Sequence, residues 1–439
     1  MAAPTPAAGT IRAEDALSPD TFRRNRLPIV ALLTANAISL FGDALTTIAI
    51  PWYVYATTGS AAKMGIVGFF TFLPRVLATF FGGGVVDRIG FKPSSMLADT
   101  LSGLSVLAIP LVHHTVGLSF PLLLLFVFLG AFFDGPGSTA RESLVPELSR
   151  MAEIPLERIN ALYQMVQRLS QLLGPAAAGV LIGVMGASNV LAIDAATFGV
   201  SLVLIGLLVP NLHMRHDEQE LSDGQRSWLQ EMLDGLRLIR ADIVLLWLAI
   251  SIAITNFLEA PLSTVSMPVL IREHYGSAER LGLVFTTFGA GAVISTIAFA
   301  SIGHRLPRHR TFAIAFTLAS LPYFVFAMAP SFPVLLVASF AMGLAGGPIN
   351  PILMTVRQER VPERIRARVF GTFTALAWCA IPLGQLVGGF SVQTFGVETT
   401  FAAIAVCFLA TAVTMGINPA LRGMNASPVR SAVTAEPRS

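Results

Sequence analysis

The sequence predicts an all-α integral membrane protein of about twelve transmembrane helices, arranged as two pseudo-symmetric six-helix bundles. The first observation is composition: 54% of the 439 residues are hydrophobic and 13% are charged, whereas a soluble globular protein carries about 25% charged residues. The second is that about twelve segments are apolar enough, at about 20 residues each, to cross a bilayer. The third is a charged connector between apolar runs that occurs twice, half a chain apart.

The apolar segments follow one another along the chain with short polar stretches between them. The predicted spans are 29–56, 62–86, 94–113, 117–139, 160–186, 189–209, 242–271, 280–303, 311–329, 332–355, 367–393 and 396–418. The spans at 160–186 and 367–393 begin with polar turns.

The repeated connector has the pattern R-x-x-x-V-P-E. Its two copies are displaced by 216 residues at every matching position, which are Arg141, Val145, Pro146 and Glu147 in the first and Arg357, Val361, Pro362 and Glu363 in the second. Tandem repeats of hydrophobic segments are typical of secondary transporters. The repeat therefore predicts two fused copies of one unit.

Five regions follow from this organisation. They are a tail at 1–28, a bundle at 29–209, a linker at 210–241, a second bundle at 242–418 and a tail at 419–439. The linker contains an amphipathic helix near Leu229 to Ile239, typical of a helix on a membrane surface.

The distribution of basic residues predicts the orientation. If the N-terminus is cytoplasmic, only Lys63, Arg272 and Arg280 fall outside, and Arg75 and Arg168 fall within spans, which leaves 24 of the 29 Lys and Arg on cytoplasmic segments. By the positive-inside rule we expect both termini and both tails to be cytoplasmic. The expected location of the protein is the cell membrane.

Two ionisable residues lie deep in the first spans. Asp43 is about 14 residues from the start of span one, or roughly 20 Å at 1.5 Å per residue. A carboxylate at that depth is costly and usually faces an aqueous cavity; the alternative is a structural helix–helix hydrogen bond. Arg75 in span two either contacts an anionic substrate or forms a structural ion pair.

Four more charged residues lie near span ends. Asp99, Asp134 and Arg141 are near the cytoplasm, where a solvated ion pair is the simplest interpretation. Asp194 lies within the first two turns of span six from the outside, where an interfacial cap would suffice. The sequence does not decide whether the three aspartates are functional or structural.

Several polar residues are candidates for contact with a substrate in a central cavity. Gln164 and Arg168 share one helical face in span five, and Asn256 and Glu259 share one in span seven. Such faces must meet protein or water. Trp378 and Gln385 in span eleven are further candidates, although an aromatic residue there equally suits packing.

Two motifs resemble known transporter sequences. The segment GGGVVDRIGFK contains Gly83, Asp87, Arg88, Gly90 and Lys92, and it is close to the G-x-x-x-D-R-x-G-R-K signature of the major facilitator superfamily, with Phe91 where a basic residue is commoner. That resemblance implies a gating role for these residues together with Arg141.

The second motif is GPAAAG, with Gly174, Pro175 and Gly179, which resembles the G-P-x-x-G-G motif of drug/proton antiporters except for Ala178. In that class the motif kinks a helix and prevents leakage; ordinary Gly/Ala packing is the alternative. Together with FGDALTTIAIPWYVY, LVPELSRMAEIPLERINALYQ, AIDAATF, RVPERIRARVFG and PLGQLVGG, the chain resembles the enterobactin-exporter and macrolide-efflux branch over residues 25–418.

We therefore expect a proton-coupled exporter of amphipathic small molecules that works by alternating access. Asp43, and after it Glu259, would couple protons to substrate, since a carboxyl group in a low-dielectric cavity can exchange a proton near neutral pH. The alternatives are a symporter that imports a small nutrient and a transporter of lysophospholipid or other lipid. The expected partners are a small-molecule substrate, protons and the lipid bilayer, with no nucleic acid and a monomeric state.

A membrane enzyme is a different class of function, and the sequence does not favour it. It has no H-E-x-x-H, G-x-S-x-G or Walker A pattern, so no catalytic residues, metal or ATP are expected and the proton motive force replaces a cofactor. Cys379 and Cys407 both lie in apolar spans, which argues against a disulfide.

Overall fold

The computed structural model describes residues 25–211, 228–362 and 365–425, and within these ranges the backbone alone of residues 78–88, 228–231 and 367. Every element in these ranges is helical. The first half comprises α1 (Leu27–Thr58), α2 (Ala61–Ile89), α3 (Phe91–Thr115), α4 (Phe120–Ala152), α5 (Leu156–Met185) and α6 (Ala187–Leu208).

The second half starts with α8 (Trp228–Ala241), which coincides with the predicted amphipathic helix. It continues with α9 (Ile243–Pro261), the π-helical turn η3 (Leu262–Ser266), α10 (Met267–His274), α11 (Ala278–Ile302), η4 (Gly303–Arg305), α12 (Arg308–Ala327), α13 (Phe332–Gly346), α14 (Ile349–Arg360), α15 (Arg366–Trp378), α16 (Ala380–Phe395), α17 (Val397–Ile417) and η6 (Pro419–Asn425).

Eleven helical stretches within the described ranges are long and apolar enough to cross a membrane, and α2 is a further helix of 29 residues. Three of the spans predicted as single helices are interrupted. Span seven changes to a π turn after Pro261, span ten breaks between Gly346 and Ile349 around Pro348, and span eleven breaks at Cys379. Proline lacks the amide hydrogen that continues an α-helix, which explains the first two interruptions.

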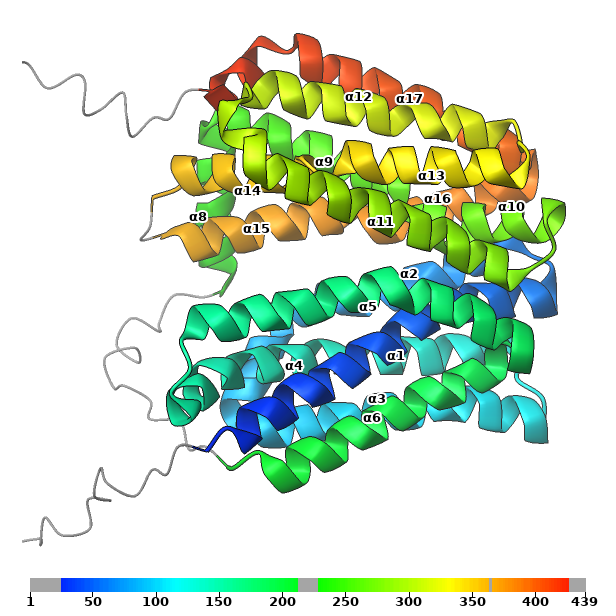
Figure 1. Cartoon of the computed structure of the whole chain (residues 1–439), viewed down its shortest axis with the longest axis vertical. Helices are drawn as coiled ribbons and strands as arrows, with labels where there is room; N and C mark the ends of the chain where they lie inside the picture. Colours follow the sequence, from blue (N-terminus) through cyan, green and yellow to red (C-terminus); the bar gives the residue numbers. More distant parts are fainter. Residues whose placement is uncertain (1–24, 212–227, 363–364, 426–439) are drawn as a thin grey trace, which may run out of the picture.

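The two halves form two groups of helices (Figure 1). In the first half α1 packs on α5 and α6, while α3 packs on α4 and α6. In the second half α9 packs on α16, α11 on α13, and α12 on α13 and α17. Between the halves, α2 packs on α16 and α5 on α11. The second helix of each half therefore meets the fifth helix of the other, as a two-fold relation between the halves requires.

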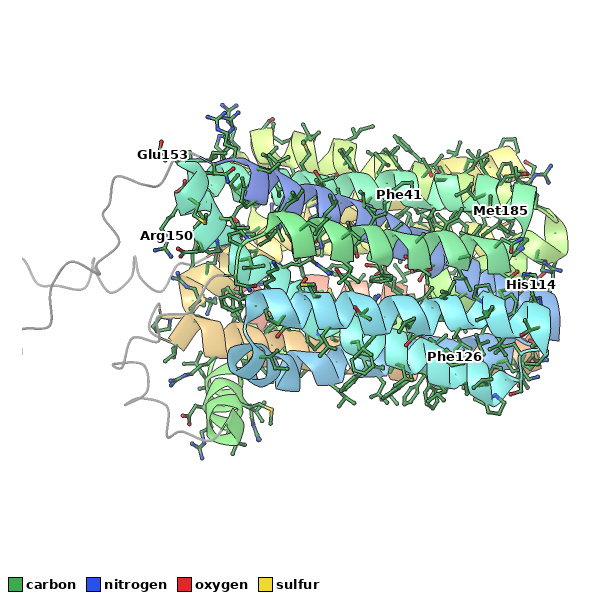
Figure 2. All side chains as sticks on the ribbon, turned by 90° about the horizontal axis from the view of Figure 1, so that it is seen from below. Phe41, His114, Phe126, Arg150, Glu153 and Met185 are labelled. Atoms are coloured by element: carbon green, nitrogen blue, oxygen red, sulfur yellow. The ribbon has the colours of Figure 1, made fainter. Side chains whose placement is uncertain are left out.

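Among the described residues, the closest backbone contacts between the halves lie toward one end of the molecule. We call the end where α1 begins and α17 ends the tail end, and the opposite end the far end; Figure 2 shows Arg150 and Glu153 at the tail end and His114 and Met185 toward the far end. A single cluster of buried apolar residues includes members of both halves, such as Val54 and Leu281. A separate cluster around Leu32 and Leu148 belongs to the first half alone and lies toward the tail end.

Glycines allow the close contact near the far end. A Cβ atom on Gly65 of α2 would meet the backbone of Gly389 in α16, and one on Gly179 of α5 would meet the backbone of Ala278 and Gly282 in α11. All of these glycines lie in the far-end part of their helices. The helices therefore converge at the far end and separate toward the tail end, as the ribbons in Figure 1 do.

Candidate functional site

A buried ion pair joins α3 and α4 in the first half. Arg141 Nη1 lies 2.6 Å from Asp99 Oδ1, and Arg141 Nη2 lies 3.6 Å from Asp134 Oδ1. Ser201 on α6 donates a hydrogen bond of 2.7 Å to the other oxygen of Asp99. Arg141 and Asp99 are each only 2% exposed, so the prediction of a solvated pair is wrong. The connector around Arg141 continues α4 as a helix, and this turns the guanidinium into the bundle.

Asp194 on α6 is also buried, and the prediction of an interfacial cap is wrong. Its carboxylate accepts hydrogen bonds from Thr46 Oγ1 of α1 at 2.5 Å and from Thr197 Oγ1 at 3.3 Å. Gly42 makes this contact possible, because a Cβ atom there would collide with both Asp194 and Thr197. Asp194 therefore fixes α6 against the middle of α1, directly beside Asp43.

Asp43 lies at the centre of this group of charges. It is half-buried in the middle of α1, and among the described residues its carboxylate has no hydrogen-bond or ion-pair partner. The charges of Asp134, Asp194, Arg75 and Arg141 act on it. An ionisable group that is surrounded by charges yet has no direct partner is free to exchange a proton or contact a ligand.

Arg75 on α2 is the second group without an ion pair. Its guanidinium lies 5.7 Å from the ring centroid of Phe72, and no carboxylate of the described chain lies within 4.0 Å of it. Among the side chains that the structure describes, none forms the structural ion pair considered for Arg75. Its charge nevertheless acts on both Asp43 and Asp194.

Helix α5 presents the predicted polar residues toward the tail end. Gln164 and Arg168 are both exposed, while the neighbouring Tyr163 is buried and donates a hydrogen bond of 3.2 Å to Asn36 Oδ1 of α1. One face of α5 thus holds the helix to its own bundle. Gln164 and Arg168 remain available for contact with a ligand.

The second-half candidates have different environments. Asn256 Nδ2 donates a 2.9 Å hydrogen bond to the carbonyl of Ala377, which joins α9 to α15, and Trp378 is 42% exposed. Gln385 is only 1% exposed and lies against Gly65 and Gly68 of α2. The predicted cavity contact is wrong for Gln385 in this conformation, because it forms part of the closed contact between α16 and α2.

Glu259 lines a cavity of about 170 Å³ inside the second half. The side chain is exposed, yet Val284, Phe326 and Met342, which share the cavity wall, are buried. The carboxylate therefore lies in the wall of a cavity whose other named lining residues are buried.

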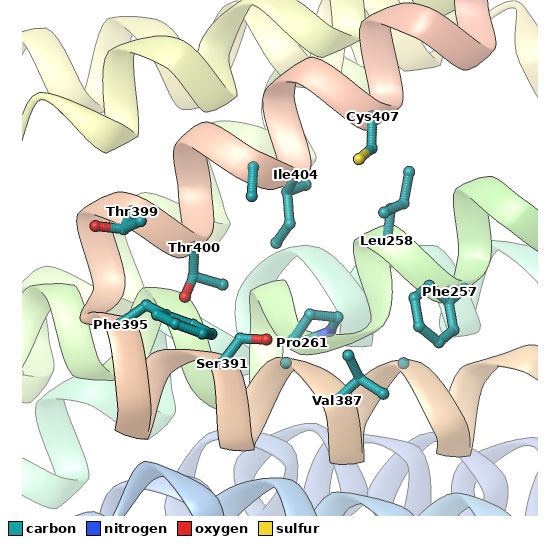
Figure 3. A pocket seen from close by; sticks show the side chains of 13 residues that line it. Phe257, Leu258, Pro261, Val387, Ser391, Phe395, Thr399, Thr400, Ile404 and Cys407 are labelled. Atoms are coloured by element: carbon teal, nitrogen blue, oxygen red, sulfur yellow. The ribbon is translucent and has the colours of Figure 1, made fainter.

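A second cavity, of about 230 Å³, lies between α9, α16 and α17 (Figure 3). Phe257, Leu258, Val387 and Ile404 line it, and its lining contains no charged residue. The two cavities are alike in being largely apolar and differ in the presence of a carboxylate.

Part of the predicted gating motif can be placed. Gly90 has a φ of 92°, which favours glycine, and precedes α3. Lys92 Nζ donates to the carbonyls of Gly206 at 2.9 Å and Val209 at 2.7 Å, so it caps the end of α6. For Gly83, Asp87 and Arg88 only the backbone belongs to the described part of the structure.

The antiporter-like motif lies at two helix contacts. Gly174 packs against Ala44 of α1, and Gly179 packs against Ala278 and Gly282 of α11. The carbonyl of Pro175 is also close to Gly282. The motif therefore lies both within the first half and at the contact between the halves, while α5 stays helical throughout.

A polar latch at the far end was missed by sequence reasoning. Tyr55 donates a hydrogen bond of 2.6 Å to Glu273 Oε1, and the guanidinium of Arg272 lies 5.3 Å from the ring centroid of Trp52. These contacts join α1 to α10. Aromatic residues at the end of span one were visible in the sequence, but nothing in it indicated which charged residues they would meet.

Known proteins share this architecture and part of this sequence. The family model described as Major Facilitator Superfamily matches residues 32–264 and 252–431. Among curated relatives, the chain is similar to "Multidrug efflux pump Tap" of Mycobacterium tuberculosis (strain ATCC 25618 / H37Rv), with 32% identity over 407 residues, 92% of this chain and 96% of that one. It is also similar to "Macrolide efflux protein A" of Streptococcus pyogenes, with 22% identity over 382 residues, 86% of this chain and 92% of that one.

Solved transporter structures have the same fold. The nucleoside transporter NupG superposes with a TM-score of 0.73 at 14% identity and covers 88% of this chain and 98% of its own. A D-xylose-proton symporter superposes with a TM-score of 0.67 at 15% identity. The match covers 89% of this chain and 97% of the symporter. The family model and the relative at 32% identity agree with the two-bundle helical fold. This chain belongs to the Major Facilitator Superfamily.

Proposed function

We propose that this chain is a proton-coupled exporter of amphipathic small molecules, of the drug, macrolide or siderophore type, which works by alternating access. The observation that carries the proposal is Asp43, an unpaired carboxylate in the middle of a membrane-spanning helix with four other charged groups acting on it. The relatives named as multidrug and macrolide efflux proteins support export. Transport without a catalytic step or a cofactor fits this arrangement, and the proton motive force supplies the energy.

The arrangement of the halves gives the proposal a direction. We take the tail end, with both termini, as cytoplasmic, in line with the positive-inside rule. The halves would then be closed toward the outside and separated toward the cytoplasm, with Gln164, Arg168 and Trp378 reachable from inside. A substrate entering there would meet Asp43, and protonation of Asp43 and departure of the substrate would alternate as the halves rock.

A proton-flux assay tests the proposal. Purified full-length protein is reconstituted as a monomer in liposomes with an inside-acid gradient, and ethidium, erythromycin or a catecholate siderophore is added. We expect one class to accelerate loss of the gradient, and Asp43→Asn to abolish the acceleration. Asp234→Asn is the matched control, because Asp234 is exposed on α8 and pairs with Arg237 at 2.9 Å.

Two results would contradict the proposal. Unchanged acceleration in correctly folded Asp43→Asn protein would remove Asp43 from coupling. If no compound class acted on the wild-type protein, the assay would favour a nutrient symporter or a lipid transporter instead.

A further inference from the structure

The cavity at Glu259 has the features of a binding site for a cation. Among the described residues between Ile243 and Ile271 and in α12, α13 and α16, Glu259 is the only carboxylate; α11 has one more, Glu279, in its exposed first turn. None of the described Lys, Arg or His side chains lies within 4.0 Å of it, and it has no hydrogen-bond partner in the same ranges. A carboxylate in a low-dielectric bundle without a countercharge is costly unless a proton or another cation neutralises it.

The walls of the cavity suit an organic cation better than a bare ion. Phe285, Phe288 and Phe326 bring three aromatic rings to the lining, and Met267 and Met342 add flexible thioethers. Aromatic faces attract cations through the ring quadrupole, and methionine adapts to ligands of different shape. Few groups in the cavity wall could replace the hydration shell of a small inorganic ion and coordinate it.

A buried hydroxyl lies in the same bundle. Tyr323 is fully buried, its hydroxyl has no hydrogen-bond partner in the described part of the chain, and the charge of Glu259 reaches it. An unsatisfied buried polar group is costly. Tyr323 is not in the cavity wall, and its unsatisfied hydroxyl one turn from Phe326 indicates that the interior of this bundle is incomplete without water or another polar group.

We propose that this cavity binds the positively charged, lipophilic end of the transported molecule, an ammonium group that carries an aryl or alkyl substituent. The inference rests on the proposed export function, and it adds the substrate class. A dry cavity of about 150 Å³ holds benzene, whereas a drug-sized ligand needs a pocket of about 300 Å³ or more. A cavity of about 170 Å³ therefore takes one ring or one substituted ammonium group, and the rest of the molecule extends past the exposed carboxylate.

The cavity in Figure 3 supplies an internal comparison. It is somewhat larger, at about 230 Å³, and it contains no charged residue. An apolar cavity of that kind has no reason to prefer a cation over its neutral counterpart. If the protein binds a cation more tightly than the neutral molecule of the same shape, the binding site is therefore the Glu259 cavity.

A pair of probes of equal shape tests the proposal on the purified full-length protein. Benzyltrimethylammonium carries the charge, and neopentylbenzene has carbon in place of the nitrogen. Affinities are measured by calorimetric titration for the wild type, Glu259→Gln and the control Glu398→Gln, which removes an exposed carboxylate that pairs with His274 at the far end. We expect Glu259→Gln to weaken binding of the ammonium on the order of tenfold and to leave neopentylbenzene within about twofold.

Two further variants keep the test decisive if Glu259→Gln does not fold. Glu259→Asp keeps the charge and should keep the preference for the ammonium. Ser263→Leu adds bulk to the cavity wall with the carboxylate intact and should weaken both probes alike.

Unchanged affinity of folded Glu259→Gln for benzyltrimethylammonium, or an equal loss for both probes, would overturn the proposal. The titration uses no proton gradient, so it is independent of coupling at Asp43. An exporter of neutral substrates would pass the liposome assay and fail this one.

Discussion

Arg141 on α4 and Asp99 on α3 form an ion pair of 2.6 Å in which both side chains are almost fully buried. With Asp134 at 3.6 Å and Ser201 on α6, the pair joins three helices of one bundle. Removal of one partner of a buried pair leaves an uncompensated charge, at a cost of about 3–5 kcal/mol.

We therefore expect Arg141→Leu to lower the stability of the protein strongly, because Asp99 and Asp134 would remain without their cation. Thermal unfolding of the purified protein measures the loss. Arg150→Leu is the matched control, since Arg150 contacts Glu147 on the surface and such pairs contribute about 0–1 kcal/mol. Equal losses in the two variants would show that the buried pair has no special structural role.

Gly282→Leu should open the far end. Its Cβ atom would meet the carbonyl of Pro175 and the backbone of Ala176 on α5, so the halves could not approach as closely. Spin labels at Val116 and Met328, both exposed near the far end of opposite halves, report the distance by pulsed electron resonance. Gly199→Leu is the control, because no atom lies within 4 Å of the corresponding Cβ position. A distance distribution unchanged by Gly282→Leu would contradict the closed contact.

Tyr55→Phe should loosen the same end by a smaller amount. The variant loses the 2.6 Å hydrogen bond to Glu273 and keeps the ring. One such bond to a charged group contributes about 1.5–3 kcal/mol, so the fraction of molecules open at the far end should rise at least severalfold with the same pair of spin labels. Thr57→Val is the control, because the Thr57 hydroxyl bonds only to carbonyls of its own helix. An equal shift in both variants would exclude a specific role for the latch.

Lys92→Met should destabilise the last turn of α6. Nζ bonds to the carbonyls of Gly206 and Val209, and a cation at the carboxyl end of a helix also interacts favourably with its dipole. We expect faster amide hydrogen exchange in the last turn of α6, measured by mass spectrometry. Lys63→Met tests specificity, since Lys63 lies over Phe120 at the far end. Protection of α6 that survives Lys92→Met would show that the cap contributes little.

The sequence predicted the fold well because it is encoded in long apolar runs and a repeat. The helices follow the predicted spans closely, and α8 lies where the amphipathic pattern placed it. The interruptions near Pro261, Pro348 and Cys379 were not predicted, because proline also occurs inside continuous helices such as α5, which contains Pro175. Whether a helix tolerates proline depends on what packs against it.

The site was predicted less completely, because charged residues were judged by depth along a helix and not by what surrounds it. Asp194 and Arg141 both looked peripheral by position. They are buried, since Gly42 brings α6 against α1 and α4 continues past its apolar run. Arg357, the counterpart of Arg141 in the repeat, instead lies 4.8 Å from the centroids of both Phe370 and Phe373. The sequence match alone could not distinguish the two environments.

The crossed contacts between the second and fifth helices have a consequence for how the chain can evolve. Gly65 and Gly282 lie 217 residues apart in the sequence, and Gly389 and Gly179 lie 210 apart, so the contact of Gly65 with Gly389 is the counterpart of the contact of Gly282 with Gly179. Two identical subunits of a symmetric dimer would meet in this way. In such a dimer every mutation occurs twice. Fusion into one chain removes that constraint. The two halves then differ in their acidic residues: Asp43, Asp99, Asp134 and Asp194 belong to one half, and among the described residues Glu259 is the carboxylate that lines the cavity of the other.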